Sequence, residues 1–325
     1  MRLTCCCKNV LKLKTLWLVF LLLLMLLESP IFAQDAEIVS SCTRYKQSVF
    51  DVQDGYSFLL PGAPITYKKL DMCRSYTPLI VGGKPAEPKE FPYMARLGNR
   101  KSDNQTDWFC GGTLITNHLV LTAAHCLFSG SGAINVVRLG ELDFASDTDD
   151  AQPEDFGVNK LTEHPSYEHN ILYNDIAIVQ LDRGVRLNAY KLPACLPFED
   201  GNRYNSFIAT GWGHTKFAGV DSRKLLKVKL NDFGSNCPTA DEIDELPNGF
   251  NSSTQLCIGS NERKDTCNGD SGGPVVVYHA EYPCMYHVMG VTSSGISCGI
   301  PNTPSLYTRV HFYLDWIKKE IAKLS

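Results

Sequence analysis

The 325-residue chain has no excess of basic charge: 31 lysines and arginines stand against 35 aspartates and glutamates, for a formal net charge of −4. Nucleic-acid-binding domains usually carry a clear basic excess, so this balance argues against nucleic acid as a partner. No Cys-x-x-Cys pair suggests a structural zinc site. Internal repeats and low-complexity tracts are also missing. The composition is that of an ordinary globular protein, and the chain is long enough for about two domains.

The N-terminal region lacks an apolar run long enough to span a membrane. Leu16–Leu27 is a run of twelve apolar residues, whereas a spanning helix needs roughly 20. Basic residues precede the run, and Ala33 follows it as a small residue for cleavage, which is typical of a secretory signal peptide. We therefore predict a signal peptide over residues 1–33, a secreted, extracellular chain that begins at Gln34, and no membrane partner. A short membrane anchor is the alternative.

Cysteines and glycosylation sequons agree with secretion. Three of the 13 cysteines fall within the leader, and ten remain. An even number of cysteines in a secreted chain predicts disulfides, although spacing alone does not decide their pairing. The sequons at Asn104 and Asn251 lie in polar surroundings and are candidate glycan acceptors. Unused sequons are the alternative.

The pattern of the chain changes near residue 80. Residues 34–79 are too few to build a sufficient core alone, so we expect an irregular, partly extended propeptide. The rest shows short strand-like runs separated by Gly, Pro and Asn, which predicts an all-β sandwich or barrel. Residues 311–323 carry apolar side chains at helical spacing and should form a terminal amphipathic helix. The strand-like runs include 112–115, 119–123, 136–140, 176–181, 207–211 and 275–278.

The sharpest motif is Gly269-Asp270-Ser271-Gly272-Gly273-Pro274. Serine is a weak nucleophile until a base removes its proton. The glycines allow unusual backbone angles, so that neighbouring N–H groups can converge and stabilise an oxyanion. A surface glycine-rich turn is the alternative, but such a turn needs no fixed Asp-Ser order. The motif therefore predicts a nucleophilic serine.

A base and an orienting acid stand earlier in the chain. The run Thr122-Ala123-Ala124-His125-Cys126 offers a histidine whose loop Cys126 could staple. Asp175 opens the apolar run 176–179, where a buried carboxylate needs a partner. A structural histidine and a strand-capping aspartate are the alternatives. The order His, Asp, Ser matches the triad of the chymotrypsin type.

With these motifs in place, residues 80–325 resemble the trypsin-like branch of the chymotrypsin-fold serine proteases. The resemblance implies an all-β fold of two six-stranded antiparallel barrels with a C-terminal helix. It also implies that Ser271 attacks the scissile carbonyl, His125 transfers the proton and Asp175 orients the ring. The N–H groups of Gly269 and Ser271 would form the oxyanion hole. Further matching strings are Ile80-Val81-Gly82-Gly83, Cys110-Gly111-Gly112-Thr113-Leu114-Ile115, Gly211-Trp212-Gly213 and Tyr307-Thr308-Arg309-Val310.

The same resemblance implies activation by cleavage at Leu79–Ile80. The new ammonium of Ile80 would pair with Asp270, whose buried carboxylate is unfavourable alone. Many relatives have Arg or Lys where this chain has Leu79. Because the enzyme's own pocket should not accept leucine, we expect a separate upstream protease that cuts after Leu.

Specificity is also assigned by resemblance. Asp265 matches the acid at the base of the pocket and predicts hydrolysis after Arg or Lys, with a surface aspartate as the alternative. Ser293 and Gly295 match residues beside the substrate. Ser305 stands where relatives usually have Gly and either narrows the pocket or binds a guanidinium.

The Leu79 junction, the cysteine-bearing prosegment and the run 286–293 resemble a narrower group. These are the snake-like members of the arthropod clip-domain serine proteases, which act in extracellular cascades. Residues 34–79 hold only two cysteines, so a clip module is absent or degenerate. Protein substrates and serpin-type inhibitors are the partners that this resemblance implies.

The resemblance further assigns disulfides and a possible ion. The implied pairs are Cys110–Cys126, Cys237–Cys257, Cys267–Cys298 and Cys73–Cys195, the last as a tether for the propeptide. Cys42 and Cys284 are left without a predicted partner. No cofactor is required, but the acidic stretch from Glu141 to Asp155 matches a calcium loop of related enzymes, with Glu141 and Glu154 as ligands. A solvated acidic loop is the alternative.

Two other functions compete with an active regulatory protease. A homologue that binds without cleaving would usually have lost a triad residue, and all three are present here. A digestive trypsin would not need a tethered prosegment or a leucine at its activation site. Both features therefore favour a regulatory enzyme.

Overall fold

The computed structural model describes most of the chain from Pro30 onward. Residues 30–35, 52–55 and 66–68 are described by their backbone alone. The signal segment up to residue 29, the Leu79–Ile80 bond, Asp265, Cys267 and Cys298 lie outside the described residues. The described ranges are 30–55, 66–73, 83–214, 219–235, 237–240, 243–262, 266, 269–282, 284–295 and 300–324.

The first half of the protease region forms a closed antiparallel barrel with strand order β10-β11-β6-β5-β4-β9. Its inner face is apolar, with Leu97 and Leu121 fully buried. The strands are β4 (Met94–Arg100), β5 (Thr106–Leu114), β6 (Leu119–Thr122), β9 (Val136–Leu139), β10 (Glu154–Glu163) and β11 (Ala177–Leu181). The turn η1 (Ala124–Leu127) and the hairpin of β7 (Phe128–Ser129) with β8 (Gly132–Ala133) follow β6.

The second half forms another barrel, with strand order β12-β15-β16-β17-β14-β13 and closure between β12 and β13. The short strand β3 (Lys84–Pro85) pairs with the outside of β13. The strands are β12 (Ser206–Gly211), β13 (Leu226–Asp232), β14 (Gln255–Gly259), β15 (Pro274–Tyr278), β16 (Tyr286–Ser294) and β17 (Ser305–Arg309). The predicted fold of two six-stranded barrels is therefore confirmed.

The chain ends in the predicted helix. A short turn, η3 (Val310–Tyr313), leads into α3 (Leu314–Ala322). Leu314 and Ile317 are buried in the same apolar cluster as the core of the first barrel. The last helix thus crosses back from the second barrel and packs against the apolar cluster that contains the core of the first.

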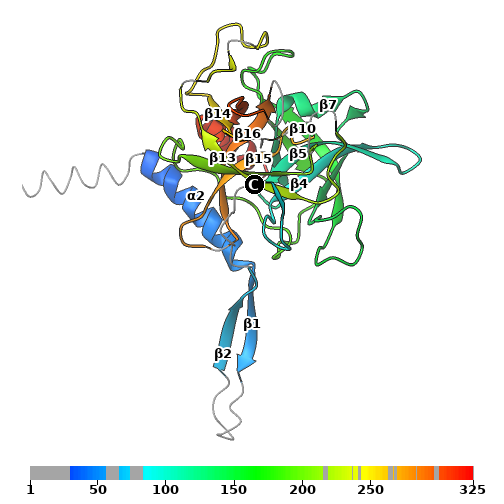
Figure 1. The fold of residues 1–325 in the computed structure, drawn as a ribbon. Coiled ribbons are helices and arrows are strands. Elements are labelled where there is room, and N and C mark those ends of the chain that lie inside the picture. The colour runs from blue at the N-terminus through cyan, green and yellow to red at the C-terminus, as the bar shows by residue number, and fades with distance from the viewer. Residues whose placement is uncertain are drawn as a thin grey trace, which may run out of the picture.

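The prosegment differs from the expected irregular strip. It forms helix α2 (Pro30–Gln47) and a hairpin of β1 (Phe50–Gly55) with β2 (Thr66–Asp71). Figure 1 shows α2 lying along the body of the protein and the hairpin projecting from it. The buried residues of α2 include Ile38 and Cys42, one turn apart, so docking onto the protease region stabilises the helix. No helix within the described ranges is long and apolar enough to cross a membrane.

Two disulfides join the prosegment to the protease region, and their pairing corrects the expectation. Cys42 bonds Cys195, and Cys73 bonds Cys284. The predicted Cys73–Cys195 pair is wrong because α2 itself carries a cysteine onto the segment around residue 195. Cys73, just beyond the hairpin, reaches the turn before β16 instead. The four sulfurs share one small apolar cluster with Val49, Leu192 and Met285.

Candidate active site

Strand pairing brings His125 and Asp175 together. Ala177 of β11 pairs with Thr122 of β6 in an antiparallel register, so the end of β6 lies beside the start of β11. His125, three residues past that pair on η1, donates through Nδ1–H to Asp175 Oδ2 at 2.8 Å. Its backbone N–H also donates to Asp175 Oδ1 at 3.0 Å. The two bonds fix the ring and leave Nε2 as the nitrogen that Asp175 does not engage.

The carboxylate of Asp175 is fully buried, at 0% exposure, and its partners come from both barrels. Ser293 of β16 donates its hydroxyl hydrogen to Oδ2 at 2.5 Å. Thr308 of β17 donates to the backbone carbonyl of Asp175 at 2.8 Å. The sequence assigned Ser293 to substrate contact, whereas the structure places its hydroxyl on Asp175. Charge-assisted bonds of this kind allow a carboxylate to stay ionised in the interior.

The pKa values of the pair move in opposite directions. Burial lowers the pKa of His125, but the charge of Asp175 and its hydrogen bond outweigh burial and raise that pKa above 6.5. Burial raises the pKa of Asp175, but His125, Ser293 and the backbone N–H lower it below 3.8. An ionised carboxylate therefore faces an imidazole that takes up a proton readily.

The turn that carries Ser271 packs against the loop of His125. The N–H of Gly111 donates to the carbonyl of Ser271 at 2.7 Å. Gly272 has φ +73°, and a Cβ there would overlap the hydroxyl of Thr122 and lie 3.0 Å from Cys126 Sγ. Cys126 bonds Cys110, and its sulfur is 3.7 Å from His125 Nε2. The turn of Ser271 thus lies against the disulfide that anchors the loop of His125, at a junction between the barrels.

Asp270 turns away from that junction into the second barrel. Its Oδ1 accepts the N–H of Gly213 at 2.8 Å. A Cβ on Gly211 or Gly213 would overlap this carboxylate, so the Gly211-Trp212-Gly213 string makes room for it. Ile80, its predicted partner, lies outside the described residues.

Two of the predicted pocket residues face each other. A Cβ on Gly295 would stand 2.6 Å from Ser305 Oγ, and Ser305 is buried on β17. A side chain at either position thus takes space from the other. Asp265, the predicted acid of the pocket, lies outside the described residues, while Thr266 beside it bonds the Tyr307 hydroxyl at 2.7 Å.

The remaining predicted sites fall in separate places. The structure contains the Cys110–Cys126 and Cys237–Cys257 disulfides that the resemblance implied. The sequon residues Asn104 and Asn251 are both exposed. Exposure makes each asparagine accessible to a glycan and leaves its use as a prediction.

Basic side chains of the protein form ion pairs with both glutamates that were predicted to bind calcium. Glu154 pairs with Lys191 and with Arg183. Glu141 pairs with Arg138 at 3.2 Å and accepts the N–H of Leu142 at 2.9 Å. Neither glutamate belongs to a group of three close ligand atoms among the described residues. The structure therefore does not bring Glu141 and Glu154 together as a cation site.

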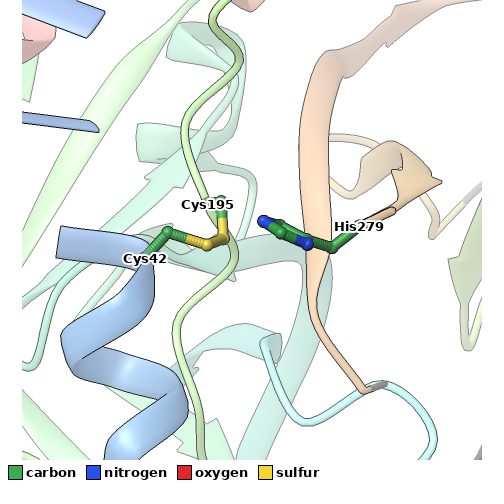
Figure 2. A group of neighbouring side chains, drawn as sticks. All are labelled: Cys42, Cys195 and His279. Atoms are coloured by element: carbon green, nitrogen blue, oxygen red, sulfur yellow. A yellow bond between two sulfur atoms is a disulfide. The ribbon is translucent and has the colours of Figure 1, made fainter. Parts of the chain in front are cut away.

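Among the described residues, two groups of Cys and His have ligand atoms within 4.8 Å of one another. One is Cys42, Cys195 and His279, shown in Figure 2 with the imidazole beside the disulfide. The other is Cys110, Cys126 and His125. In each group the two sulfurs are bonded to each other. Only a thiolate is an effective metal ligand, so neither group is a metal site in the oxidised protein.

Sequence reasoning missed Arg96 and Thr308. Arg96 lies on β4 between the fully buried Ala95 and Leu97, and it is itself only 2% exposed. Its guanidinium donates to the carbonyl of Gly269 at 2.6 Å. An arginine between two buried apolar residues of a strand was a visible signal for a buried polar contact. Thr308 lies within the motif at 307–310 that matched the family, but the motif gave no sign that Thr308 bonds the backbone of Asp175.

Comparison with known proteins agrees with this geometry. Residues 80–317 match the trypsin family. The chain is 39% identical over 254 residues to Serine protease snk of Drosophila melanogaster, covering 76% of this chain and 58% of that protein. It is 36% identical over 245 residues to Venom protease of Bombus pensylvanicus (73% and 96%) and 35% identical over 263 residues to CLIP domain-containing serine protease B4 of Anopheles gambiae (75% and 71%). The chain belongs to the trypsin family, as a serine-type endopeptidase of the arthropod clip-domain type.

Proposed function

We propose that the chain is the precursor of a secreted endopeptidase whose catalytic triad is Ser271, His125 and Asp175. The observation that carries this proposal is the bond between the half-buried His125 and the fully buried Asp175, beside the turn of Ser271. His125 Nε2 accepts the hydroxyl proton as Ser271 attacks the scissile carbonyl, and it then gives that proton to the leaving amine. Asp175 holds the Nδ1–H tautomer and stabilises the imidazolium. The same cycle with water as the nucleophile releases the acyl group.

The N–H groups of Gly269 and Ser271 stabilise the oxyanion of the tetrahedral intermediate. Loss of one such donor typically lowers kcat by about 10²- to 10³-fold. Activation cleaves Leu79–Ile80, and the Ile80 ammonium pairs with Asp270. The space between Gly211 and Gly213 that holds the Asp270 carboxylate supports this step, because it leaves the half-buried carboxylate next to the turn.

The activating enzyme is a separate protease that cuts after Leu79. Asp265 at the base of the pocket selects Arg or Lys in the substrate, and a guanidinium or ammonium cannot be replaced by leucine there. The facing pair of Gly295 and Ser305 narrows the pocket on one side. Self-activation is therefore not expected.

We place the enzyme in an extracellular proteolytic cascade with protein substrates and serpin-type inhibitors. Relatives with 34% identity include a protein called Phenoloxidase-activating factor 3, from Holotrichia diomphalia, over 257 residues. The two disulfides between prosegment and protease region support a regulatory role, since both halves stay linked after cleavage. Cleavage of the signal peptide after Ala33 and glycans on Asn104 and Asn251 complete the secreted form.

The test uses a variant in which Asp-Asp-Asp-Asp-Lys replaces residues 75–79. Enteropeptidase then cuts this variant before Ile80 and leaves Ile80 as the new N-terminus. The cleaved protein should react with a fluorophosphonate at Ser271 and hydrolyse a peptide library after Arg or Lys. Asp265→Ala should remove that preference while the fluorophosphonate still reacts. The wild-type precursor incubated alone should produce no Ile80 terminus. Absence of labelling in the cleaved protein would refute the triad, and rapid self-cleavage would refute the separate activator.

A further inference from the structure

Arg96 reaches from the first barrel into the turn that precedes the nucleophile. Its Nη1–H donates to the carbonyl of Gly269 at 2.6 Å, across 173 residues of sequence. Its Nη2 forms an ion pair with Asp221.

The placement of this guanidinium is energetically demanding. An arginine stays charged inside a protein, and a buried charge without partners strongly destabilises the fold. Burial lowers the pKa of Arg96, while the charges of Asp221 and Asp270 raise it. Asp270 belongs to the turn and Asp221 packs against it, so the stabilisation of Arg96 depends on the turn being in its observed position.

Asp221 completes the contact from the other side. Its Oδ2 pairs with Arg96, and its Oδ1 lies 3.3 Å from His214 Nε2. A Cβ added to Gly269 would stand 2.7 Å from Asp221 Oδ1. Arg96 therefore holds the carbonyl of Gly269 while Asp221 packs against its α-carbon.

These contacts bear on one backbone conformation. Gly269 has φ +92°, a region open to glycine and strained for other residues. Glycine is also the residue with the greatest backbone freedom, so its orientation must be fixed from outside. The N–H and the carbonyl of Gly269 lie in the peptide planes on either side of its α-carbon, so a bond that fixes the carbonyl limits the direction of the N–H through φ and ψ of this one residue.

We propose that Arg96 is a positioning residue for the oxyanion hole: together with Asp221 it fixes Gly269 so that its N–H faces the developing oxyanion. This inference rests on the proposed function, in which that N–H is one of the two donors. Arg96 touches neither substrate nor Ser271 Oγ. Its effect belongs to the transition state, because the oxyanion develops only there.

The test compares Arg96→Gln with Arg96→Lys and Asp221→Asn in the cleaved enzyme. Arg309→Gln is the matched control: Arg309 is 6% exposed and donates to the carbonyls of Asp200 and Gln255 in the second barrel, away from the turn. We measure kcat and KM on a cleavable peptide amide, the melting temperature, and affinity for two inhibitors. One inhibitor is a peptide boronic acid, which forms a tetrahedral adduct, and the other is the same peptide as an unreactive amide.

Arg96→Gln should lower kcat about 10- to 100-fold with little change in KM, since the donor is misplaced rather than removed. Boronate affinity should fall by a similar factor, and affinity for the unreactive amide should not change. Arg96→Lys should recover part of the loss, and Asp221→Asn should show a smaller loss of the same kind. Arg309→Gln should lower the melting temperature and leave kcat and boronate affinity unchanged.

If Arg96→Gln does not fold, Arg96→Lys and Asp221→Asn decide the question with the same two inhibitors. Equal kcat and equal boronate affinity in folded Arg96 variants, beside an active wild-type enzyme, would overturn the role of Arg96 alone. A shift confined to KM, or parallel losses in Arg309→Gln, would do the same. A cleaved wild-type chain that hydrolyses no peptide would instead overturn the proposed function.

Discussion

Ser293 donates its hydroxyl to Asp175 Oδ2 at 2.5 Å, the same oxygen that His125 engages from the other barrel. The hydroxyl is buried and belongs to β16, whereas Asp175 precedes β11. The bond therefore joins the two barrels at the carboxylate on which the proposed mechanism depends.

Ser293→Ala should lower the free energy of unfolding by about 1–3 kcal/mol at pH 7, as expected for a hydrogen bond to a charged group. The pKa of Asp175 lies below 3.8 in the folded protein, so this stabilisation exists above that pH and disappears as pH falls through the folded value. Urea unfolding at pH 7 and below pH 3.8 measures both parts. Thr292→Val is the control, because its hydroxyl bonds the neutral carbonyl of Gly273 at 3.0 Å. An equal, pH-independent loss in both variants would contradict the assignment.

The raised pKa of His125 sets the pH at which activity is lost on the acid side of the pH–rate profile. Catalysis needs the neutral imidazole, so kcat/KM should fall with decreasing pH around a midpoint above 6.5. Asp175→Asn removes the causes that raise this pKa and leaves burial, which lowers it. The midpoint should then move below 6.5, and kcat should fall by about 10⁴-fold. A wild-type midpoint at or below the ordinary value would show that Asp175 does not control the ring.

Gly272→Ala should abolish folding of the nucleophile turn. The residue has φ +73°, and the added Cβ would stand 2.7 Å from the carbonyl of Gly111. Gly249 is the matched control, with φ +71° and nothing within 4 Å of an added Cβ. Gly249→Ala should therefore destabilise by only about 1 kcal/mol and keep activity. Similar melting temperatures for the two variants would mean that the turn is not packed as described.

The two prosegment disulfides predict a redundant tether. After cleavage at Leu79–Ile80, removal of either pair alone, Cys42 with Cys195 or Cys73 with Cys284, should leave the halves linked on a non-reducing gel. Removal of both pairs should release the prosegment. Release of the prosegment from the Cys73→Ser/Cys284→Ser variant, in which Cys42 and Cys195 are kept, would show that no disulfide links helix α2 to the protease region.

Calcium should not affect stability through the acidic loop. Lys191, Arg183 and Arg138 already neutralise Glu154 and Glu141. Melting with excess calcium and with chelator should give the same midpoint. A calcium-dependent rise that Glu154→Gln removes would restore the cation site.

Much of the site followed from local sequence. The glycine-rich turn at Ser271, the strand before His125 and the apolar strand after Asp175 each have a pattern with a physical cause. Pairing of β6 with β11 then places His125 and Asp175 together, so no contact between more distant segments is needed to predict that they meet. The C-terminal helix could also be predicted, since its apolar residues follow the helical period along its whole length.

Other features depend on contacts between distant segments. Helix α2 has no strong helical signal of its own, and burial of Ile38 and Cys42 against the protease region stabilises it. The pairing of Cys42 and Cys73 follows from that docking, and spacing could not decide it. The bond from Arg96 to Gly269 spans both barrels, so the sequence around Arg96 gave no indication of its target.

The central claim is that Ser271 becomes a reactive nucleophile when the chain is cut before Ile80. The most direct measurement is peptide mapping of fluorophosphonate adducts on the precursor and on the cleaved protein, with Ser271→Ala beside them. One adduct should form, on Ser271; it should form rapidly only after cleavage and should be absent from the Ser271→Ala variant. Equal labelling before and after cleavage, or an adduct at another residue, would contradict it.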